Sequence, residues 1–121
     1  MDKFTGILHA TPEKRYKNFI STVVDTENVW MLSNQQGFAT IDKEDSIYLL
    51  VWPAQEYAKY FSKEENDKPT AIEIHDFCDQ CREICKDTNI KFMVFPTDEN
   101  SFVINTEYLL YDIEEELDRV E

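Results

Sequence analysis

The chain has 121 residues, of which 42% are hydrophobic and 13% aromatic, so it has enough apolar material to fold as one domain spanning residues 1–121. Its 25 acidic and 12 basic residues give a formal charge of -13. Such a charge repels phosphate backbones and anionic lipid headgroups, and we therefore expect neither a nucleic acid nor a membrane as partner.

The first predicted element is a helix that begins at Thr11. A threonine hydroxyl accepts a free helical N–H, and Pro12 at the first helical position has no N–H to satisfy. The helix should run to about Asp25. The stripe that should face the core comprises Tyr16, Phe19, Ile20 and Val23. The residues expected to face solvent are Lys14, Arg15, Lys17 and Asn18.

Two strands and a buried third should follow this helix. Residues 29–33 and 38–42 flank a polar turn that contains Gly37, which predicts a hairpin. Residues 47–52 are continuously apolar, as expected of a central strand that is covered on both faces.

The second half of the chain alternates helices and strands. The predicted elements are a helix over 54–62 that starts after Pro53, a strand over 71–74, a helix capped by Asp76 that reaches about Thr88, strands over 91–95 and 102–105, and a final acidic helix that follows Thr106. We therefore predict an α+β fold: a single small, mixed, mainly antiparallel sheet of about six strands with four helices packed against it.

The three cysteines, Cys78, Cys81 and Cys85, are the residues with the most chemical promise. A helical wheel at about 100° per residue places them in the buried stripe and His75 off it. Four ligands along about 15 Å of one helix cannot converge on a tetrahedral metal, so we expect no metal site. A redox role is the alternative, because a helix N-terminus lowers a thiol pKa, but neighbouring carboxylates such as Asp79 raise it. We expect inert thiols.

No catalytic apparatus is recognisable. A Gly-x-Ser-x-Gly elbow is missing, and Gly6 and Gly37, the two glycines in the chain, cannot form a glycine-rich phosphate loop. We therefore expect no catalytic residue and no cofactor. An odd number of crowded cysteines does not resemble a disulfide framework, and residues 1–20 contain no apolar run typical of a signal peptide. These features predict a cytoplasmic protein.

A cluster of aromatic residues is the best candidate for a binding surface. It comprises Trp30, Trp52, Tyr57, Tyr60 and Phe61. Aromatic side chains on strands usually pack in the core, but these residues could instead line a groove beside the predicted central strand.

Several dipeptides of the chain resemble those of a known bacterial family. They include Val29-Trp30, Gly37-Phe38, Trp52-Pro53 and Phe95-Pro96, and the acidic last helix extends the likeness from Tyr16 to Leu117. In these features the chain resembles the bacterial domain-of-unknown-function 2750 family, which implies a small cytosolic protein and assigns no catalytic residue. The order of elements is more distantly similar to the N-terminal domain of the enhanced-serine-sensitivity protein family.

Two functions remain open. The first is a non-catalytic intracellular protein-interaction module, such as an inhibitor or immunity protein, whose charge speeds association with a basic protein. The alternative is a small-ligand-binding protein or enzyme that uses an aromatic and acidic pocket near Trp52 and Tyr57. The oligomeric state is left open, although short hairpins offer edges through which copies could pair.

Overall fold

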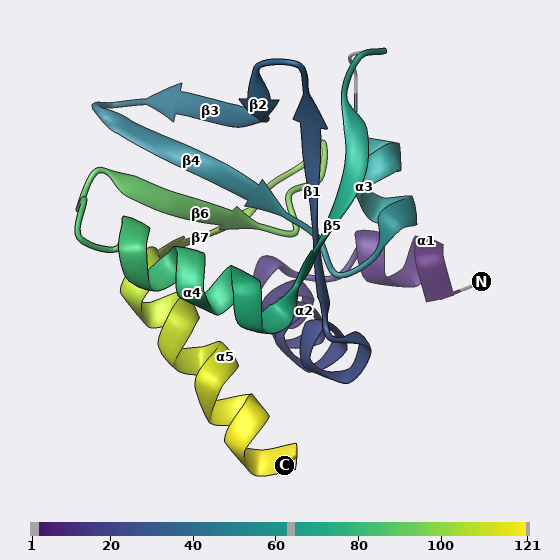
Figure 1. Ribbon diagram of the computed structural model, residues 1–121. Helices are drawn as coiled ribbons and strands as arrows, with labels where there is room; N and C mark the ends of the chain where they lie inside the picture. Colours follow the sequence, from purple (N-terminus) through teal and green to yellow (C-terminus); the bar gives the residue numbers. More distant parts are fainter. Residues whose placement is uncertain (1–2, 63–64, 121) are drawn as a thin grey trace.

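Five helices and seven strands form the described part of the chain, which is residues 3–62 and 65–120 of a computed structural model (Figure 1). In chain order they are α1 (Lys3–Leu8), α2 (Pro12–Thr26), β1 (Asn28–Asn34), β2 (Gly37–Phe38), β3 (Thr40–Lys43), β4 (Ser46–Val51), α3 (Gln55–Phe61), β5 (Lys68–Glu73), α4 (Ile74–Ile84), β6 (Ile90–Val94), β7 (Phe102–Asn105) and α5 (Thr106–Val120). The α+β class is confirmed, with one more helix than predicted.

The strands form two sheets where one was predicted, with the orders β2-β1-β5 and β3-β4-β6-β7. All neighbours are antiparallel except β4 and β6, which are parallel. Two links join the sheets. Trp30 and Trp52 exchange backbone hydrogen bonds of 3.0 and 2.8 Å, and the Ala39 N–H between β2 and β3 donates to the Leu32 carbonyl at 2.8 Å. The predicted strand over 38–42 is thus bent at Ala39, and its halves pair with different sheets.

Helices α2, α4 and α5 cover one face of the β3-β4-β6-β7 sheet. The Phe77 ring of α4 meets the Phe92 ring of β6 edge-on at 5.5 Å, and Tyr16 of α2 stacks on Phe102 of β7 at 4.2 Å. The Tyr16 hydroxyl also donates a hydrogen bond to the Asp112 carboxylate, which joins α2 to α5. These contacts place the side chains of both long helices against the main core cluster.

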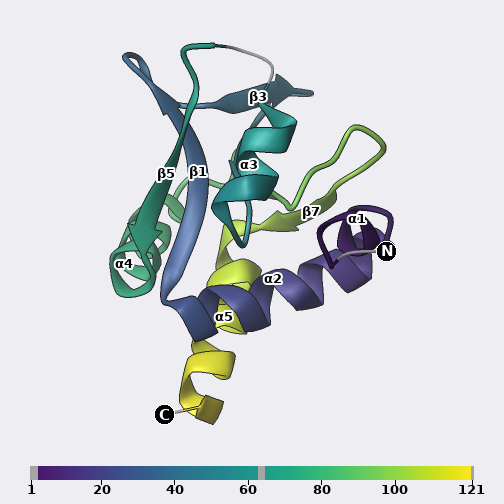
Figure 2. The same cartoon turned by 90° about the vertical axis from the view of Figure 1, so that its right-hand side faces the viewer.

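The C-terminal turns of α2 and α5 lie on the same side of the molecule, and α5 extends beyond the ends of α2 and α4 (Figures 1 and 2). Helix α2 stops at Glu27, which adopts the left-handed conformation with φ 63° and ψ 23°. The Glu27 carbonyl accepts a hydrogen bond from the Ile74 N–H at 2.9 Å, so this turn is tied to the start of α4. Residues of both helix ends line a hollow, which is described below.

Two helix boundaries differ from the predictions. The α4 helix is capped by Glu73 and not by Asp76, because the Glu73 side chain reaches forward to accept the Asp76 N–H at 3.1 Å. It also ends at Ile84, earlier than the predicted Thr88. Helix α1 was not predicted. Among the described residues, no helix is both long and apolar enough to cross a membrane.

Candidate functional site

The predicted aromatic cluster is divided by the fold into buried and exposed members. Trp52 is fully buried, its Nε1–H donates to the Pro96 carbonyl at 3.1 Å, and its ring lies 5.3 Å from the half-buried Phe61 ring. Trp30 is also half-buried and packs against the core. The indole of Trp52 therefore serves the core and is closed to a ligand in this conformation.

The remaining aromatic residues lie on α3. Tyr57 is half-buried, with its ring 4.8 Å from that of Phe95, and Tyr60 is 57% exposed. The hollows described below are lined by other residues. A binding surface at Trp30, Tyr57, Tyr60 and Phe61 stays a prediction.

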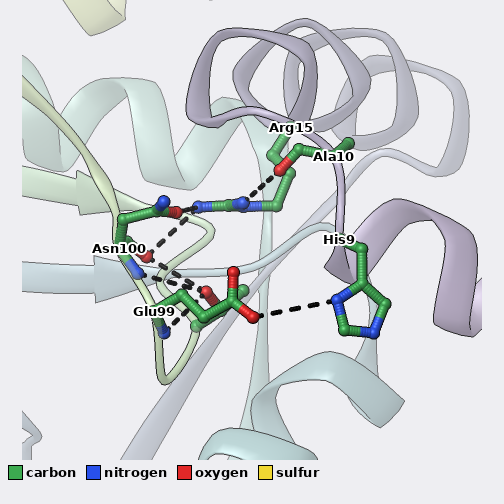
Figure 3. Close-up of polar contacts among 6 residues, drawn as sticks. His9, Ala10, Arg15, Glu99 and Asn100 are labelled. Carbon is green, nitrogen blue, oxygen red and sulfur yellow. Dashed lines mark hydrogen bonds and ion pairs between the residues drawn. The ribbon is translucent and has the colours of Figure 1, made fainter.

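Arg15 is buried, although the helical pattern predicted that it would face solvent. It is 1% exposed, and its guanidinium bonds to backbone carbonyls (Figure 3). Its Nε donates to Phe95 at 3.1 Å and its Nη1 to Ala10 at 2.6 Å. Its Nη2 donates to the carbonyl of Asn100 at 3.1 Å and to the side-chain oxygen of the same residue. Arg15 therefore anchors the loop between β6 and β7.

The positive charge of Arg15 interacts with carboxylates that do not bond to it directly. Burial lowers the pKa of Arg15, and the nearby carboxylates of Glu99 and Glu13 act in the opposite direction. Figure 3 shows Glu99 facing His9 at the surface, with His9 Nδ1 3.8 Å from Glu99 Oε1. Because its guanidinium bonds to oxygen atoms of three residues of the chain and the residue is 1% exposed, Arg15 is a structural residue.

The cysteines follow the predicted stripe. Cys78 and Cys81 are buried, and Cys85 is half-buried with its Sγ 3.2 Å from the Arg82 carbonyl. Burial raises the pKa of Cys78 to about 11 and that of Cys81 to about 12. In the described part of the chain, no group of three or more His, Cys, Asp or Glu side chains is placed to hold a metal ion. With their raised pKa values, the buried thiols of Cys78 and Cys81 are poor nucleophiles at neutral pH.

A hollow of about 640 Å³ lies between the C-terminal halves of α2 and α5. We call it the α2–α5 hollow. Its lining residues are Ser21, Thr22, Val24, Asp25, Glu27, Glu116, Leu117 and Val120. Three of these are acidic and three are aliphatic, and none of them is basic. The sequence alone does not place the end of α2 beside the acidic last helix, so it does not predict this hollow.

Comparison with known proteins gives one family. A family described as "Protein of unknown function (DUF2750)" matches residues 16–113 of the chain. The chain belongs to this family. A search of curated proteins finds no match.

The DUF2750 match covers all of the aromatic cluster and all three cysteines, and it covers part of the α2–α5 hollow. It includes Trp52 and Phe95 and starts one residue after Arg15. In the α2–α5 hollow it includes the residues from α2 and stops at position 113, before Glu116. Because the family is described as one of unknown function, it assigns no chemical role to any of these residues.

The α2–α5 hollow differs in charge from its neighbour on the other side of α5. There a hollow of about 190 Å³ contains Arg82, which donates to Asp79 at 2.5 Å and to Glu114 at 2.8 Å, so two of its three carboxylates pair with a cation in the same lining. In the α2–α5 hollow only Glu116 has a described ion pair, with Arg119 outside the lining at 3.0 Å. Carboxylates above aliphatic side chains can bind a cation that carries an apolar stem, such as lysine or arginine.

Proposed function

We propose that this DUF2750 chain is a non-catalytic intracellular protein-interaction module that binds a basic protein, as an inhibitor or immunity protein does. The observation that carries the proposal is the gathering of negative charge around the C-terminal half of α5. That helix has six acidic residues and one basic residue, Arg119. The acidic α2–α5 hollow adjoins the same half of the helix.

The physical case depends on where the basic residues lie. Arg15 is buried, and Arg82 and Arg119 each pair with a carboxylate of α5. The other basic residues do not neutralise the excess, and the whole chain keeps its formal charge of -13. A negative surface of this kind raises the rate at which a positive partner associates, and the effect falls as salt is added.

The alternative of a small-ligand site near Trp52 and Tyr57 has less support. Trp52 is 0% exposed, and its indole N–H is already used by the Pro96 carbonyl. Tyr57 packs on Phe95. A ligand there would have to displace core contacts, whereas a basic partner needs no such change at α5.

A bacterial cytoplasm is the proposed location. Cys78, Cys81 and Cys85 are all free thiols in the structure, which is typical of proteins from a reducing compartment. The resemblance of the chain to a bacterial family supports the same proposal.

The proposal is tested by capture followed by reconstitution. The full chain is immobilised at low salt, retained proteins are identified, and the purified candidate is titrated by calorimetry. We expect a basic protein whose affinity falls steeply with salt, because screening shortens the Debye length to roughly 10 Å at 0.1 M. If no basic protein is retained at low salt, the proposal is wrong.

A matched pair of triple variants shows which surface binds. Both remove three carboxylates from exposed positions and differ only in place. The first is Asp25→Asn/Glu115→Gln/Asp118→Asn near the ends of α2 and α5. The control is Asp42→Asn/Glu44→Gln/Asp45→Asn in β3 and its turn. We expect at least a ~10-fold loss of affinity in the first variant alone, since binding should depend on the charges that contact the partner.

A further inference from the structure

Two helix C-termini meet at the α2–α5 hollow, and its charge is unusual for such a place. The C-terminal end of a helix carries the negative end of the macrodipole, where cations are favoured. Helix α2 has no basic residue in its last turn, and Asp25 and Glu27 lie there instead. The negative ends of both helices therefore add to the carboxylates, and the hollow is a region where a cation is favoured.

Glu27 is also unfavourable for the backbone. Its φ of 63° lies in the left-handed region, which glycine adopts readily and a residue with a Cβ does not. Glycine at this position would make the turn more stable, so local structure does not account for a glutamate here.

The apolar stripe of α5 continues into the hollow. Leu109 and Ile113 are fully buried, Leu117 is half-buried, and Val120 is 62% exposed. With Val24 of α2, Leu117 and Val120 supply the aliphatic part of the lining. The hollow thus combines an apolar surface with carboxylates, and both can contribute to binding.

We infer that the α2–α5 hollow binds a basic amphipathic helix of the partner, and this inference rests on the proposed function. An aliphatic side chain of that helix enters between Val24, Leu117 and Val120. A lysine or arginine one turn away meets Asp25 and Glu27, since residues three or four apart share a helix face. A nucleic acid is excluded as occupant by the sign of the charge.

Arg119 is a competing cation that pairs with a lining residue of the hollow. It donates to Glu116 at 3.0 Å, but its side chain is 78% exposed. Exposed ion pairs of this kind contribute little stability, so a partner's cation can replace Arg119. We therefore expect Arg119→Gln to strengthen binding by about twofold to fivefold.

The probe is a synthetic amphipathic peptide of leucine and lysine, with leucines at helical spacing and both ends capped. Its affinity for the full chain is measured by fluorescence anisotropy at low and moderate salt. A second peptide has the same composition with the leucines spread around the helix. We expect the amphipathic peptide to bind more tightly than the second one, because only it presents apolar anchors on one face.

The decisive comparison is Glu27→Gly against Asp45→Gly. Each variant removes one carboxylate from a left-handed position, at φ 63° and φ 66°, and both leave the chain with the same charge. Asp45 lies in the turn between β3 and β4, away from the hollow (Figure 1). We expect Glu27→Gly to weaken peptide binding by about fivefold and Asp45→Gly to change it less than about twofold. Neither variant should lower the melting temperature, so lost binding cannot be ascribed to unfolding.

The apolar contact is tested by Val120→Ser against Val103→Ser. Both valines are exposed, at 62% and 48%, but Val103 lies on β7. Only Val120→Ser should weaken the amphipathic peptide, by about fivefold. If the paired variants weaken binding equally, or if neither weakens it, the hollow is not the site. In that case the proposed function stands only if the triple variant near the ends of α2 and α5 binds the basic partner more weakly than the wild-type chain does. If the wild-type chain binds neither the peptide nor a basic protein, the proposed function and this inference both fail.

Discussion

Arg15 shows how a single charged side chain can organise a loop from inside the core. Its donors join Ala10, which precedes the N-cap Thr11 of α2, to two points of the loop that follows β6, at Phe95 and Asn100. The guanidinium also lies 5.9 Å from the centre of the Phe95 ring. Phe95 adopts φ 52°, an unfavourable conformation for a bulky residue, and these contacts hold it there.

Replacing Arg15 should therefore destabilise the fold strongly. Arg15→Met leaves the carbonyls of Phe95, Ala10 and Asn100 without their donor, and we expect a loss of about 3 kcal/mol in the free energy of unfolding. Arg15→Lys should recover less than half of this, because an ammonium cannot reproduce the planar fork.

Urea unfolding measures both Arg15 variants, with Arg119→Met as control. Arg119 is exposed and pairs only at the surface, so its loss should change the free energy of unfolding by less than about 0.5 kcal/mol. Full recovery by lysine would show that charge alone matters at position 15.

The buried thiols predict a loss of stability at alkaline pH. The pKa values of Cys78 and Cys81 are about 11 and about 12 in the folded chain, above the value of 9.0 for a free thiol. The stability contributed by a raised thiol pKa is fully present below pH 9, where the thiols are protonated in the folded and the unfolded chain alike. It is lost as the pH rises from 9 toward 12, because the unfolded chain then releases protons that the folded chain still holds. Unfolding measured from pH 8 to pH 10 should show a fall in stability.

Cys78→Ala/Cys81→Ala is the matched variant for this pH test. It should be less stable at pH 7, because two buried side chains are shortened, yet its stability should fall less between pH 8 and pH 10. Burial, followed by the hydrogen bond to the Asp112 carboxylate, also raises the pKa of Tyr16. Equal slopes for the two proteins would contradict the buried-thiol account.

At the scale of elements, the cap of α2 illustrates what local sequence can specify. Thr11 accepts the Lys14 N–H at 3.2 Å, and Pro12 occupies the first helical position. Thr11→Ala should lower the free energy of unfolding by about 1 kcal/mol, and Thr11→Asp should keep it near the wild-type value. Thr88→Ala in an exposed loop is the control, and a similar loss there would mean that capping is not the cause.

Signals of this local kind explain which elements could be predicted. Turn residues and apolar periodicity lie within a few positions, so the hairpins, the central strand β4 and most helices were found. Helix α1 was missed because its six residues include Gly6 and carry no cap signal, and it depends on Ile7 and Leu8 packing against the core. The break at Ala39 depends on Leu32, seven positions earlier, across the sheet.

The candidate site was predicted less well for the same physical reason. Burial of Cys78 and Cys81 follows from a helical wheel, which is a local property. Burial of Arg15 does not, because its partners at Phe95 and Asn100 are 80 and 85 positions away. The α2–α5 hollow likewise joins Glu27 to Glu116 through tertiary packing alone, so no sequence pattern reveals it.

At the scale of the whole molecule, the charge of -13 should oppose folding as well as favour a basic partner. Repulsion among carboxylates destabilises the compact state, and salt screens it. We therefore expect the free energy of unfolding at pH 7 to rise as salt is added. Affinity for a basic partner should fall over the same range, because screening then weakens attraction.

The contribution of α5 to this repulsion can be isolated with one substitution. Asp118→Lys places a cation near the C-terminal turn of α5, where the macrodipole favours it, and removes one of the six acidic residues. It should raise the free energy of unfolding by about 0.5 kcal/mol at low salt and by less at high salt. Asp42→Lys on β3 makes the same change in charge without a helix dipole and should gain less. The acidic end of α5 is therefore the part of the chain where stability and the proposed binding make opposite demands, and a stabilised Asp118→Lys chain that kept full affinity for a basic partner would contradict that view.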